Sequence, residues 1–181
     1  MYHRVASPPF DPWGLCVAPE RFREQLAILK QHHPLLSMDE LVQGLAAGNL
    51  PARAVALTFD DGYSDNATTA KPMLEEFEIP ATMFLTTGLI ERQTPFWWDE
   101  LAALVLASRG ATDFDFEIAG VRLTARWDAQ DALPADLKDW RAEERTGDPR
   151  RLAYLRLWQA LQRQVAATRE TTVAVGFGTR R

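Results

Sequence analysis

Residues 55–63 read VALTFDDGY, and this stretch decides how the fold of the chain is interpreted. Its apolar start is rich in residues that favour β-strands, so we predict a buried strand that ends at Asp60. Asp60, Asp61 and Gly62 then follow at the carboxyl end of the strand, where barrels and open α/β folds place their reactive groups. Because Asp and Gly also dominate turns, a simple turn after a strand is the alternative interpretation.

The two adjacent carboxylates suit a hydrolytic site. Like charges this close do not ionise independently, so a bound cation would hold one carboxylate as a ligand and leave the other to accept a proton. Asp60 and Asp61 therefore predict metal-assisted hydrolysis.

The first ninety residues predict alternating strands and helices. We expect strands over residues 2–5, 55–60 and 81–85, and helices over 19–32, 37–48 and 67–77, the last kinked at Pro72. Phe22, Leu26 and Leu29 would form the buried face of the first helix, while Ser37 and Glu40 form a capping-box pattern for the second. Strand, helix and strand in succession predict parallel pairing through a right-handed crossover, with the Asp pair at the mouth of the sheet.

The pattern changes after residue 94. A helix is expected over residues 99–107, and Phe114, Phe116 and Ile118 alternate with polar residues as in one strand of a hairpin whose turn would be Ala119-Gly120. A long amphipathic helix is expected further on, with its apolar face formed by Leu152, Leu155, Trp158, Leu161 and Val165.

Composition allows an ordinary globular domain and excludes some functions. The 181 residues are 46% hydrophobic and 25% charged, and a formal net charge of −5 argues against a nucleic-acid partner. Cys16 is the only cysteine, so the chain forms no internal disulfide. We predict no signal peptide and no membrane span, and hence a cytoplasmic location, because no apolar stretch is long enough.

Several motifs, in order along the chain, resemble the polysaccharide deacetylases of carbohydrate esterase family 4, which share the nodulation-deacetylase (NodB) homology domain. They are YHRV at residues 2–5, PERF at 19–22, SMDEL at 37–41, TFDDG at 58–62, PATMFL at 80–85 and FWWDEL at 96–101. The resemblance implies an α/β fold, an incomplete and deformed (β/α) barrel with a helical and hairpin insertion. Residues 1–93 would be its first β/α units, 94–168 the insertion and 169–181 a doubtful C-terminal tail.

The resemblance also implies a reaction, which is the metal-dependent hydrolysis of acetyl groups on an acetylated polysaccharide or oligosaccharide. Carried over by position in the motif, Asp60 would be the general base and Asp61 a ligand of a divalent metal, which is usually zinc in the full-length family. A metal-bound water has a lowered pKa and the metal polarises the amide carbonyl, so a neighbouring carboxylate only has to accept the proton.

The chain departs from the family pattern in its histidines. The family completes its metal site with a His-Ser/Thr-x-x-His-Pro motif, whereas His3, His32 and His33 all precede the Asp pair. A catalytic zinc usually takes three protein ligands, so we expect a truncated chain that is weak or inactive as a deacetylase. The alternatives are a non-catalytic module that binds carbohydrate or a partner, and a remnant without function.

Four residues are candidates for substrate contact: His3, Tyr63, Trp97 and Trp98. His3 would lie on the first strand, near the cleft, and a hydrogen-bonded core histidine is the alternative. The paired tryptophans offer flat apolar rings that suit a sugar face, and packing within the core is the alternative. His32 and His33 are interpreted as the end of the first helix, where histidine is favoured and Pro34 stops the helix.

Overall fold

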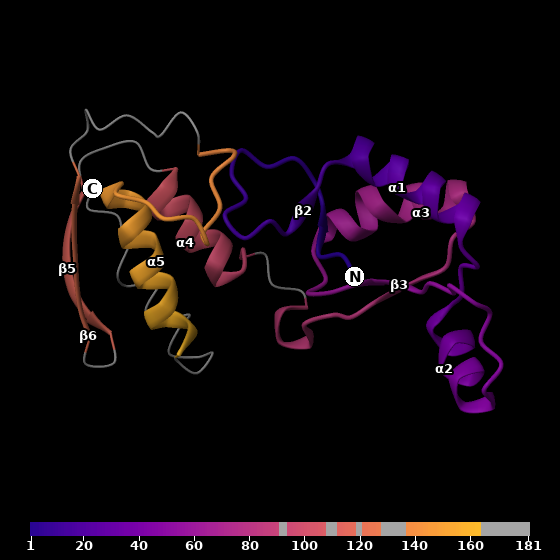
Figure 1. The fold of residues 1–181 in the computed structure, drawn as a ribbon. Helices are drawn as coiled ribbons and strands as arrows, with labels where there is room; N and C mark the ends of the chain where they lie inside the picture. The colour runs from indigo at the N-terminus through magenta and orange to yellow at the C-terminus, as the bar shows by residue number, and fades with distance from the viewer. Residues whose placement is uncertain (91–93, 108–111, 119–120, 128–136, 164–181) are drawn as a thin grey trace. The chain divides into compact units, whose positions relative to one another are not determined.

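The computed structural model describes residues 1–90, 94–107, 112–118, 121–127 and 137–163. The chain divides into two compact units, Met1–Arg92 and Gln93–Arg181. Figure 1 shows the course of the chain and its labelled elements. Each unit is described by itself. The interpretation of residues 94–168 as an insertion, and of 169–181 as a doubtful tail, stays a prediction, and the tail lies outside the described residues.

Short parallel strands form the centre of the first unit. Strand β1 (Arg4–Val5) pairs with β2 (Cys16–Val17), and β3 (Leu57–Phe59) pairs with β4 (Ala81–Met83), both in parallel. A single parallel bridge between Tyr2 and Phe59 makes β1 the neighbour of β3. The predicted parallel pairing across the crossover from β3 to β4 is thus confirmed. The described strands form no closed barrel, so the incomplete barrel stays a prediction.

Two helices of the first unit begin and end as the sequence predicts. Helix α1 (Pro19–His32) has Pro19 in its first turn and buries Phe22 and Leu26. Helix α2 (Met38–Ala47) has Ser37 as its N-cap in a complete capping box with Glu40, and it ends at Gly48, which adopts the left-handed conformation.

The third helical segment differs from the prediction of a helix kinked at Pro72. A π-helical turn, Asn66–Ala70, comes first, and α3 (Lys71–Phe77) follows directly with Pro72 in its first turn. Proline lacks an N–H and its ring crowds the carbonyl four residues earlier. In the wider π turn, the Lys71 amide donates to the Asn66 carbonyl. This turn comes just before Pro72, so α3 begins at Lys71 and has no kink within it.

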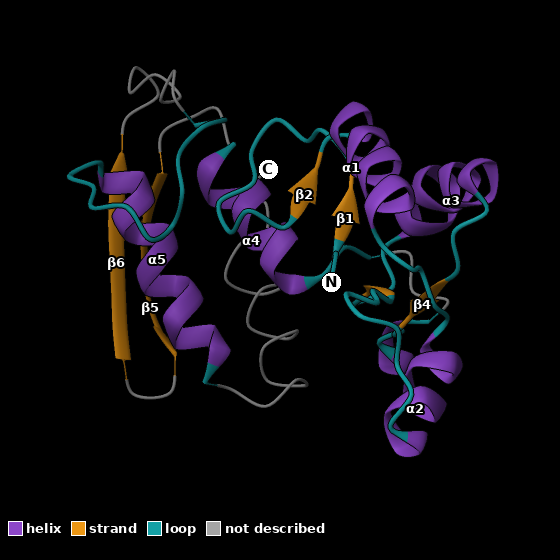
Figure 2. Ribbon diagram, turned by 45° about the vertical axis from the view of Figure 1, so that its right-hand side comes forward, coloured by secondary structure: helices purple, strands orange, loops and turns teal. Residues whose placement is uncertain are grey.

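The core of the first unit lies where the helices α1 and α3 pack on the strands, and Figure 2 shows these two helices side by side. Its fully or nearly fully buried members are Val5, Phe22, Leu26, Leu57, Phe59, Ala70, Leu74 and Ile79. Three aromatic rings meet there. Tyr2 stacks on Phe59 with ring centroids 5.4 Å apart, and Phe22 meets Tyr2 edge-on at 5.1 Å. This packing joins β1, β3 and α1 and so fixes the strand that carries the Asp pair.

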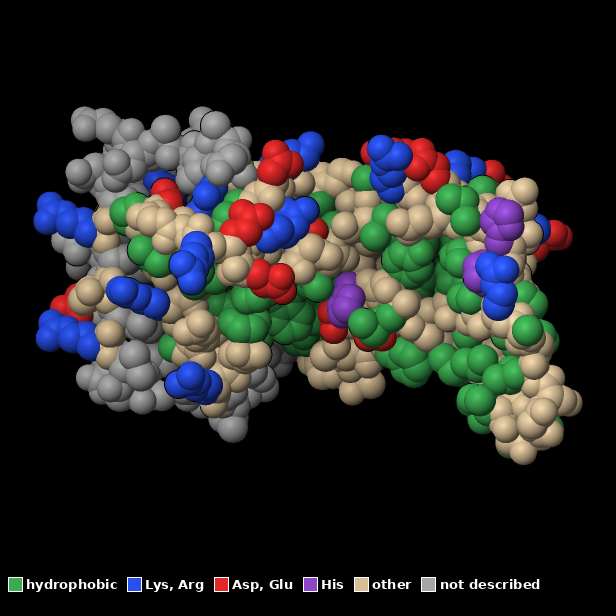
Figure 3. All heavy atoms as spheres, in the orientation of Figure 1, with side chains coloured by type: hydrophobic (Ala, Val, Ile, Leu, Met, Phe, Trp, Pro, Cys, Tyr) green, Lys and Arg blue, Asp and Glu red, His purple; other side chains and the backbone are tan. Residues whose placement is uncertain are grey.

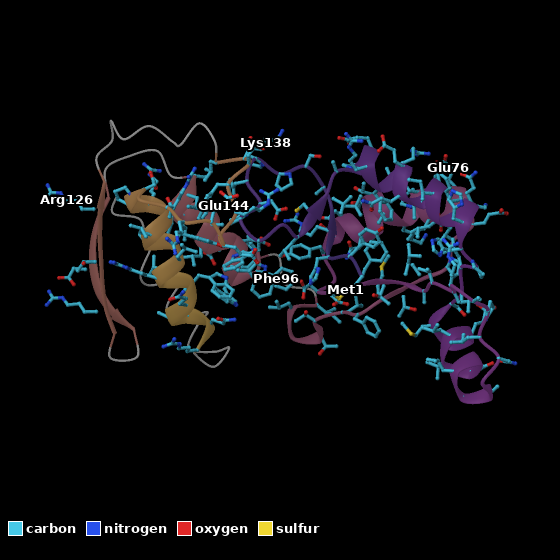
Figure 4. The ribbon with its side chains drawn as sticks, viewed as in Figure 1. Met1, Glu76, Phe96, Arg126, Lys138 and Glu144 are labelled. Atoms are coloured by element: carbon cyan, nitrogen blue, oxygen red, sulfur yellow. The ribbon has the colours of Figure 1, made fainter. Side chains whose placement is uncertain are left out.

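The second unit consists of two helices and a hairpin. Helix α4 (Trp97–Leu106) begins two residues before the predicted start, and β5 (Thr112–Ile118) pairs with β6 (Val121–Trp127) in antiparallel register. The predicted hairpin is confirmed, while its turn at residues 119–120 lies outside the described residues. Arg122 donates Nε–H to Asp115 Oδ1 at 2.7 Å across the hairpin. Figure 4 shows Arg126 projecting from β6 on the side away from α5.

Helix α5 (Pro149–Gln162) confirms the predicted long helix but not its predicted face. Leu152 is 37% exposed, and Val165 lies outside the described residues. Leu161 of the predicted face is buried, and Leu155 and Trp158 are half-buried. The buried residues also include several outside that face: Arg150, Arg151, Ala153, Tyr154 and Leu157. The difference arises because α5 packs against both α4 and β6, so its buried surface is wider than one stripe and includes arginine stems. Arg151 lies over the Trp140 ring, with its guanidinium carbon 5.1 Å from the ring centroid.

Candidate active site

The Asp pair lies in a tight turn at the carboxyl end of β3. The Asp60 amide donates to the Tyr2 carbonyl at 2.9 Å, so the extended backbone continues through Asp60. Asp61 and Gly62 then both adopt positive φ angles, +71° and +79°, and the Gly62 amide donates to the Asp60 carbonyl at 2.9 Å. The Asp61 carbonyl accepts from the Thr86 amide at 3.3 Å. Backbone hydrogen bonds therefore fix the turn on two sides, with Tyr2 just before β1 and with Thr86 just after β4.

Gly62 is required by its surroundings as well as by its backbone conformation. A Cβ atom at this position would lie 2.9 Å from Leu85 Cδ2 and 3.4 Å from Leu85 Cα. Any larger residue would have both a strained φ angle and a steric conflict with Leu85. This contact explains in physical terms why a glycine follows the two aspartates.

The electrostatics of the turn involve His3 as well as Asp60. Partial burial raises the pKa of the Asp61 carboxyl, the charge of His3 lowers it, and the neighbouring Asp60 carboxylate adds to the rise. His3 is thus close enough to act electrostatically on Asp61, although it lies in a bend just before β1 and not on the strand itself as predicted. His32 and His33 lie elsewhere, at the end of α1, and His33 Nδ1 lies 3.0 Å from the Arg53 carbonyl oxygen.

A polar network that sequence reasoning missed holds the segment after the turn. Asp65 Oδ1 accepts from the Val5 amide at 3.0 Å, and Asp65 Oδ2 accepts from Arg4 Nε at 2.9 Å. The Arg4 guanidinium carbon also lies 4.3 Å from the centre of the Tyr63 ring. The sequence signal was an aspartate four residues after the Asp pair with an arginine next to His3, but only the fold brings them together.

The candidate substrate-contact residues are divided between the two units. His3 and Tyr63 lie in the first unit, and Tyr63 is only 8% exposed. Trp97 and Trp98 lie in the second, where Trp98 stacks on Phe96 with ring centroids 4.6 Å apart and Trp97 meets Trp98 edge-on at 5.6 Å. One face of Trp98 is therefore occupied by Phe96, which is labelled in Figure 4.

The donor set does not fit the metal centre that the resemblance implies. Among the described residues, no three His, Cys, Asp or Glu side chains are grouped so that they could hold a metal ion. Asp61 supplies one carboxylate, whereas a catalytic zinc site typically has three protein ligands. In the same described part of the chain, no helix is long and apolar enough to cross a membrane.

Comparison with known proteins agrees with the motifs. The family model of the polysaccharide deacetylases matches residues 47–111. The poly-β-1,6-N-acetyl-D-glucosamine N-deacetylase of Escherichia coli K12 is 34% identical over 82 residues, which are 44% of this chain and 12% of the relative. The enzyme of the same name from Staphylococcus epidermidis is 35% identical over 75 residues, which are 41% of this chain and 26% of the relative. Residues 47–111 thus resemble the polysaccharide deacetylase family.

Two solved structures of deacetylases are also similar to parts of the chain. The Streptococcus pyogenes deacetylase PplD, solved in complex with acetate, is 31% identical and has a TM-score of 0.46 over 52% of this chain and 45% of its own. A de-N-acetylase from Aggregatibacter actinomycetemcomitans is 15% identical, with a TM-score of 0.47 over 99% of this chain and 74% of its own. The chain spans about a quarter or less of the length of the curated relatives named above.

Proposed function

We propose that this chain provides part of the active site of a carbohydrate N-deacetylase, which hydrolyses acetyl groups on an acetylated polysaccharide or oligosaccharide. The observation that carries the proposal is the Asp60-Asp61-Gly62 turn at the carboxyl end of β3, within the segment that matches the family. Both curated relatives are named for poly-β-1,6-N-acetyl-D-glucosamine, so a β-1,6-linked oligomer of N-acetylglucosamine is the substrate to test.

In this proposal Asp60 and Asp61 of the turn and the nearby His3 have separate roles. Asp60 is the general base that accepts a proton from the attacking water, and its backbone is fixed by the bond to Tyr2. His3 contacts the acetamido group and can supply the proton that the leaving amine needs. Asp61 would hold a divalent metal such as zinc only together with further ligands, and no such group of side chains is found among the described residues.

The other predicted substrate contacts are proposals of a weaker kind. Tyr63 is buried, and the Arg4 guanidinium covers its ring. A supporting role beneath Arg4 therefore suits Tyr63 better than direct contact with the sugar. Trp97 and Trp98 pack on other aromatic rings in a separate unit, although both remain partly exposed. A sugar-stacking role for the two tryptophans, a cytoplasmic location and the absence of a nucleic-acid partner all stay predictions.

The test is an acetate-release assay on the purified chain with the β-1,6-linked oligomer, with and without added zinc. We expect slow release, because no three potential metal ligands are grouped together among the described residues. Asp60→Asn should lower the remaining rate by about 100-fold or more, since this is the usual contribution of a general base. His32→Asn is the matched control, because His32 is exposed at the end of α1 and should leave the rate unchanged.

The outcomes separate the interpretations that the sequence left open. Acetate release that depends on Asp60 supports the proposed deacetylase. Binding of the oligomer without any release of acetate would favour a non-catalytic carbohydrate-binding module. An oligomer that is neither bound nor hydrolysed would show that the proposed function is wrong for this chain.

A further inference from the structure

The register of β3 and β4 decides which side chains share a face with Asp60. Leu57 pairs with Ala81, Thr58 with Thr82 and Phe59 with Met83. Leu57 and Phe59 are buried in the core, and Ala81 and Met83 pack against the same cluster. Since successive side chains of a strand point to opposite faces, Thr58 and Thr82 lie on the face away from this core.

The same alternation extends one step further, to Asp60 and Phe84. The Phe84 amide donates to the Phe59 carbonyl at 2.7 Å, so the ladder continues past the end of β4. The Asp60 amide likewise continues the pairing of β3 with Tyr2. Asp60 and Phe84 are each two residues beyond the Thr58–Thr82 pair, which places them on one face and in neighbouring positions across the two strands.

Phe84 is exposed at this position. Its relative exposure is 51%, whereas Phe22 and Phe59 in the core are fully buried. Leu85 and Ile90, which follow in the chain, are also more than half exposed. Figure 3 shows hydrophobic side chains exposed on the visible face of the Met1–Arg92 unit. A large apolar side chain beside a candidate general base is available for a ligand rather than for the core.

We infer that Phe84 is a substrate-contacting residue of the proposed site and packs against the apolar face of the N-acetylated sugar whose acetyl group reaches Asp60. The inference rests on the proposed deacetylase function. An aromatic ring is a suitable surface for this contact, because pyranose rings present flat C–H faces while their hydroxyl groups point outward. Phe84 lies across from Asp60 on the neighbouring strand. A sugar packed on the Phe84 ring would therefore lie about one strand spacing, about 5 Å, from the Asp60 carboxylate.

The test is the affinity of the full chain for the β-1,6-linked N-acetylglucosamine oligomer, measured by NMR titration. Phe84→Ala should weaken binding by about 3- to 10-fold, which corresponds to the usual contribution of an aromatic contact. Phe84→Tyr keeps the ring and should bind like the wild type. Since Phe84 is half exposed, circular dichroism and the Tm should show that both variants remain folded.

A matched control is available on α2. Val42 and Leu45 are 56% and 64% exposed, and Val42→Ala and Leu45→Ala should leave the affinity unchanged because these residues are not on the Asp60 face of the strands. Asp60→Asn should remove acetate release and leave oligomer binding in place. This variant separates the failure of the catalytic proposal from the failure of the binding inference.

Three results would overturn the inference. Wild-type affinity in Phe84→Ala would show that Phe84 does not contact the sugar, although the proposed function would stand. A change of sedimentation coefficient in Phe84→Ala, without a change of affinity, would assign the residue to an interface between copies of the chain. No binding of the oligomer by the wild-type chain would remove the inference together with the proposed function.

Discussion

Arg4 and Asp65 form a largely buried ion pair that ties strand β1 to the segment after the Asp-Asp-Gly turn. Arg4 Nε donates to Asp65 Oδ2 at 2.9 Å, and the two side chains are 24% and 13% exposed. The second oxygen of Asp65 accepts from the amide of Val5, a residue with no exposed surface. The pair therefore joins the strand that follows His3 to the segment that follows the Asp60-Asp61-Gly62 turn.

The first prediction concerns this ion pair. Asp65→Ala should lower the free energy of unfolding by about 2–3 kcal/mol, because it removes the acceptor of the buried Val5 amide and the carboxylate that Arg4 Nε binds. Urea unfolding measures the loss. Glu24→Ala is the control, since it removes the Arg21–Glu24 pair, whose side chains are 70% and 59% exposed, and should cost less than about 1 kcal/mol. Equal losses in the two variants would contradict the structural role of Asp65.

A second prediction concerns Gly62. Gly62→Ala should destabilise the chain by about 2–3 kcal/mol, because it combines a positive φ angle with a Cβ atom 2.9 Å from Leu85 Cδ2. Gly48→Ala has a similar φ angle but no heavy atom within 4 Å, so it should cost only about 1 kcal/mol. The difference in the free energy of unfolding between the two variants measures the contact with Leu85. Adding Leu85→Ala should recover part of the loss in Gly62→Ala, and a double variant without recovery would exclude this contact as the cause.

Helix α2 provides a third prediction. Ser37 Oγ accepts from the Glu40 amide at 3.2 Å, and Glu40 Oε2 accepts from the Ser37 amide at 2.8 Å. Ser37→Ala should therefore cost about 1 kcal/mol of stability in chemical denaturation. Ser7→Ala, at an exposed position in the loop after β1, should cost less than about 0.5 kcal/mol. A cost for Ser37→Ala no greater than that of the control would show that the capping box contributes nothing.

Local sequence signals predicted the elements that depend on neighbouring residues. Ser37, Glu40 and Gly48 define α2 because capping and the left-handed stop involve residues within one turn. Pro19 and Pro34 bracket α1 for the same reason. The parallel pairing of β3 with β4 also followed from the order of strand, helix and strand, because crossover connections have one preferred hand.

Features that depend on distant residues were not predictable in this way. The Arg4–Asp65 pair joins residues 61 positions apart, so the motif around Asp60 gave no indication of the partner of Asp65. The exposed position of Phe84 depends on the register between two strands, and its sequence alone indicated an ordinary strand residue. The buried face of α5 was assigned wrongly at Leu152 because the helix packs on two elements, whereas a periodic pattern assumes one.

The roles assigned to the candidate site residues stay predictions, and the sequence indicated only part of the geometry around them. The motif identified Asp60 and Asp61, and the fold places both in one turn with His3 acting electrostatically on Asp61. The motif could not show that Gly62 is held against Leu85, or that the Asp61 carbonyl is bound by the Thr86 amide. These contacts come from the strand end of β4, which is a separate part of the sequence.

The last prediction follows from the raised pKa of Asp61. A carboxyl group whose pKa is higher in the folded chain than in the unfolded chain binds more protons when folded, so it lowers stability as the pH rises through the interval between the two values. Asp61→Asn removes this group and keeps a residue that tolerates the left-handed conformation. Between about pH 3.5 and pH 7, the stability difference between variant and wild type should therefore increase in favour of the variant. The increase should stay below about 1 kcal/mol because Asp61 is only partly buried and solvent screens its charge.

Urea unfolding at a series of pH values measures this difference. A difference in stability that stays constant with pH is attributed to the backbone rather than to ionisation. A difference that falls with rising pH would mean that His3 stabilises the Asp61 carboxylate more than burial destabilises it.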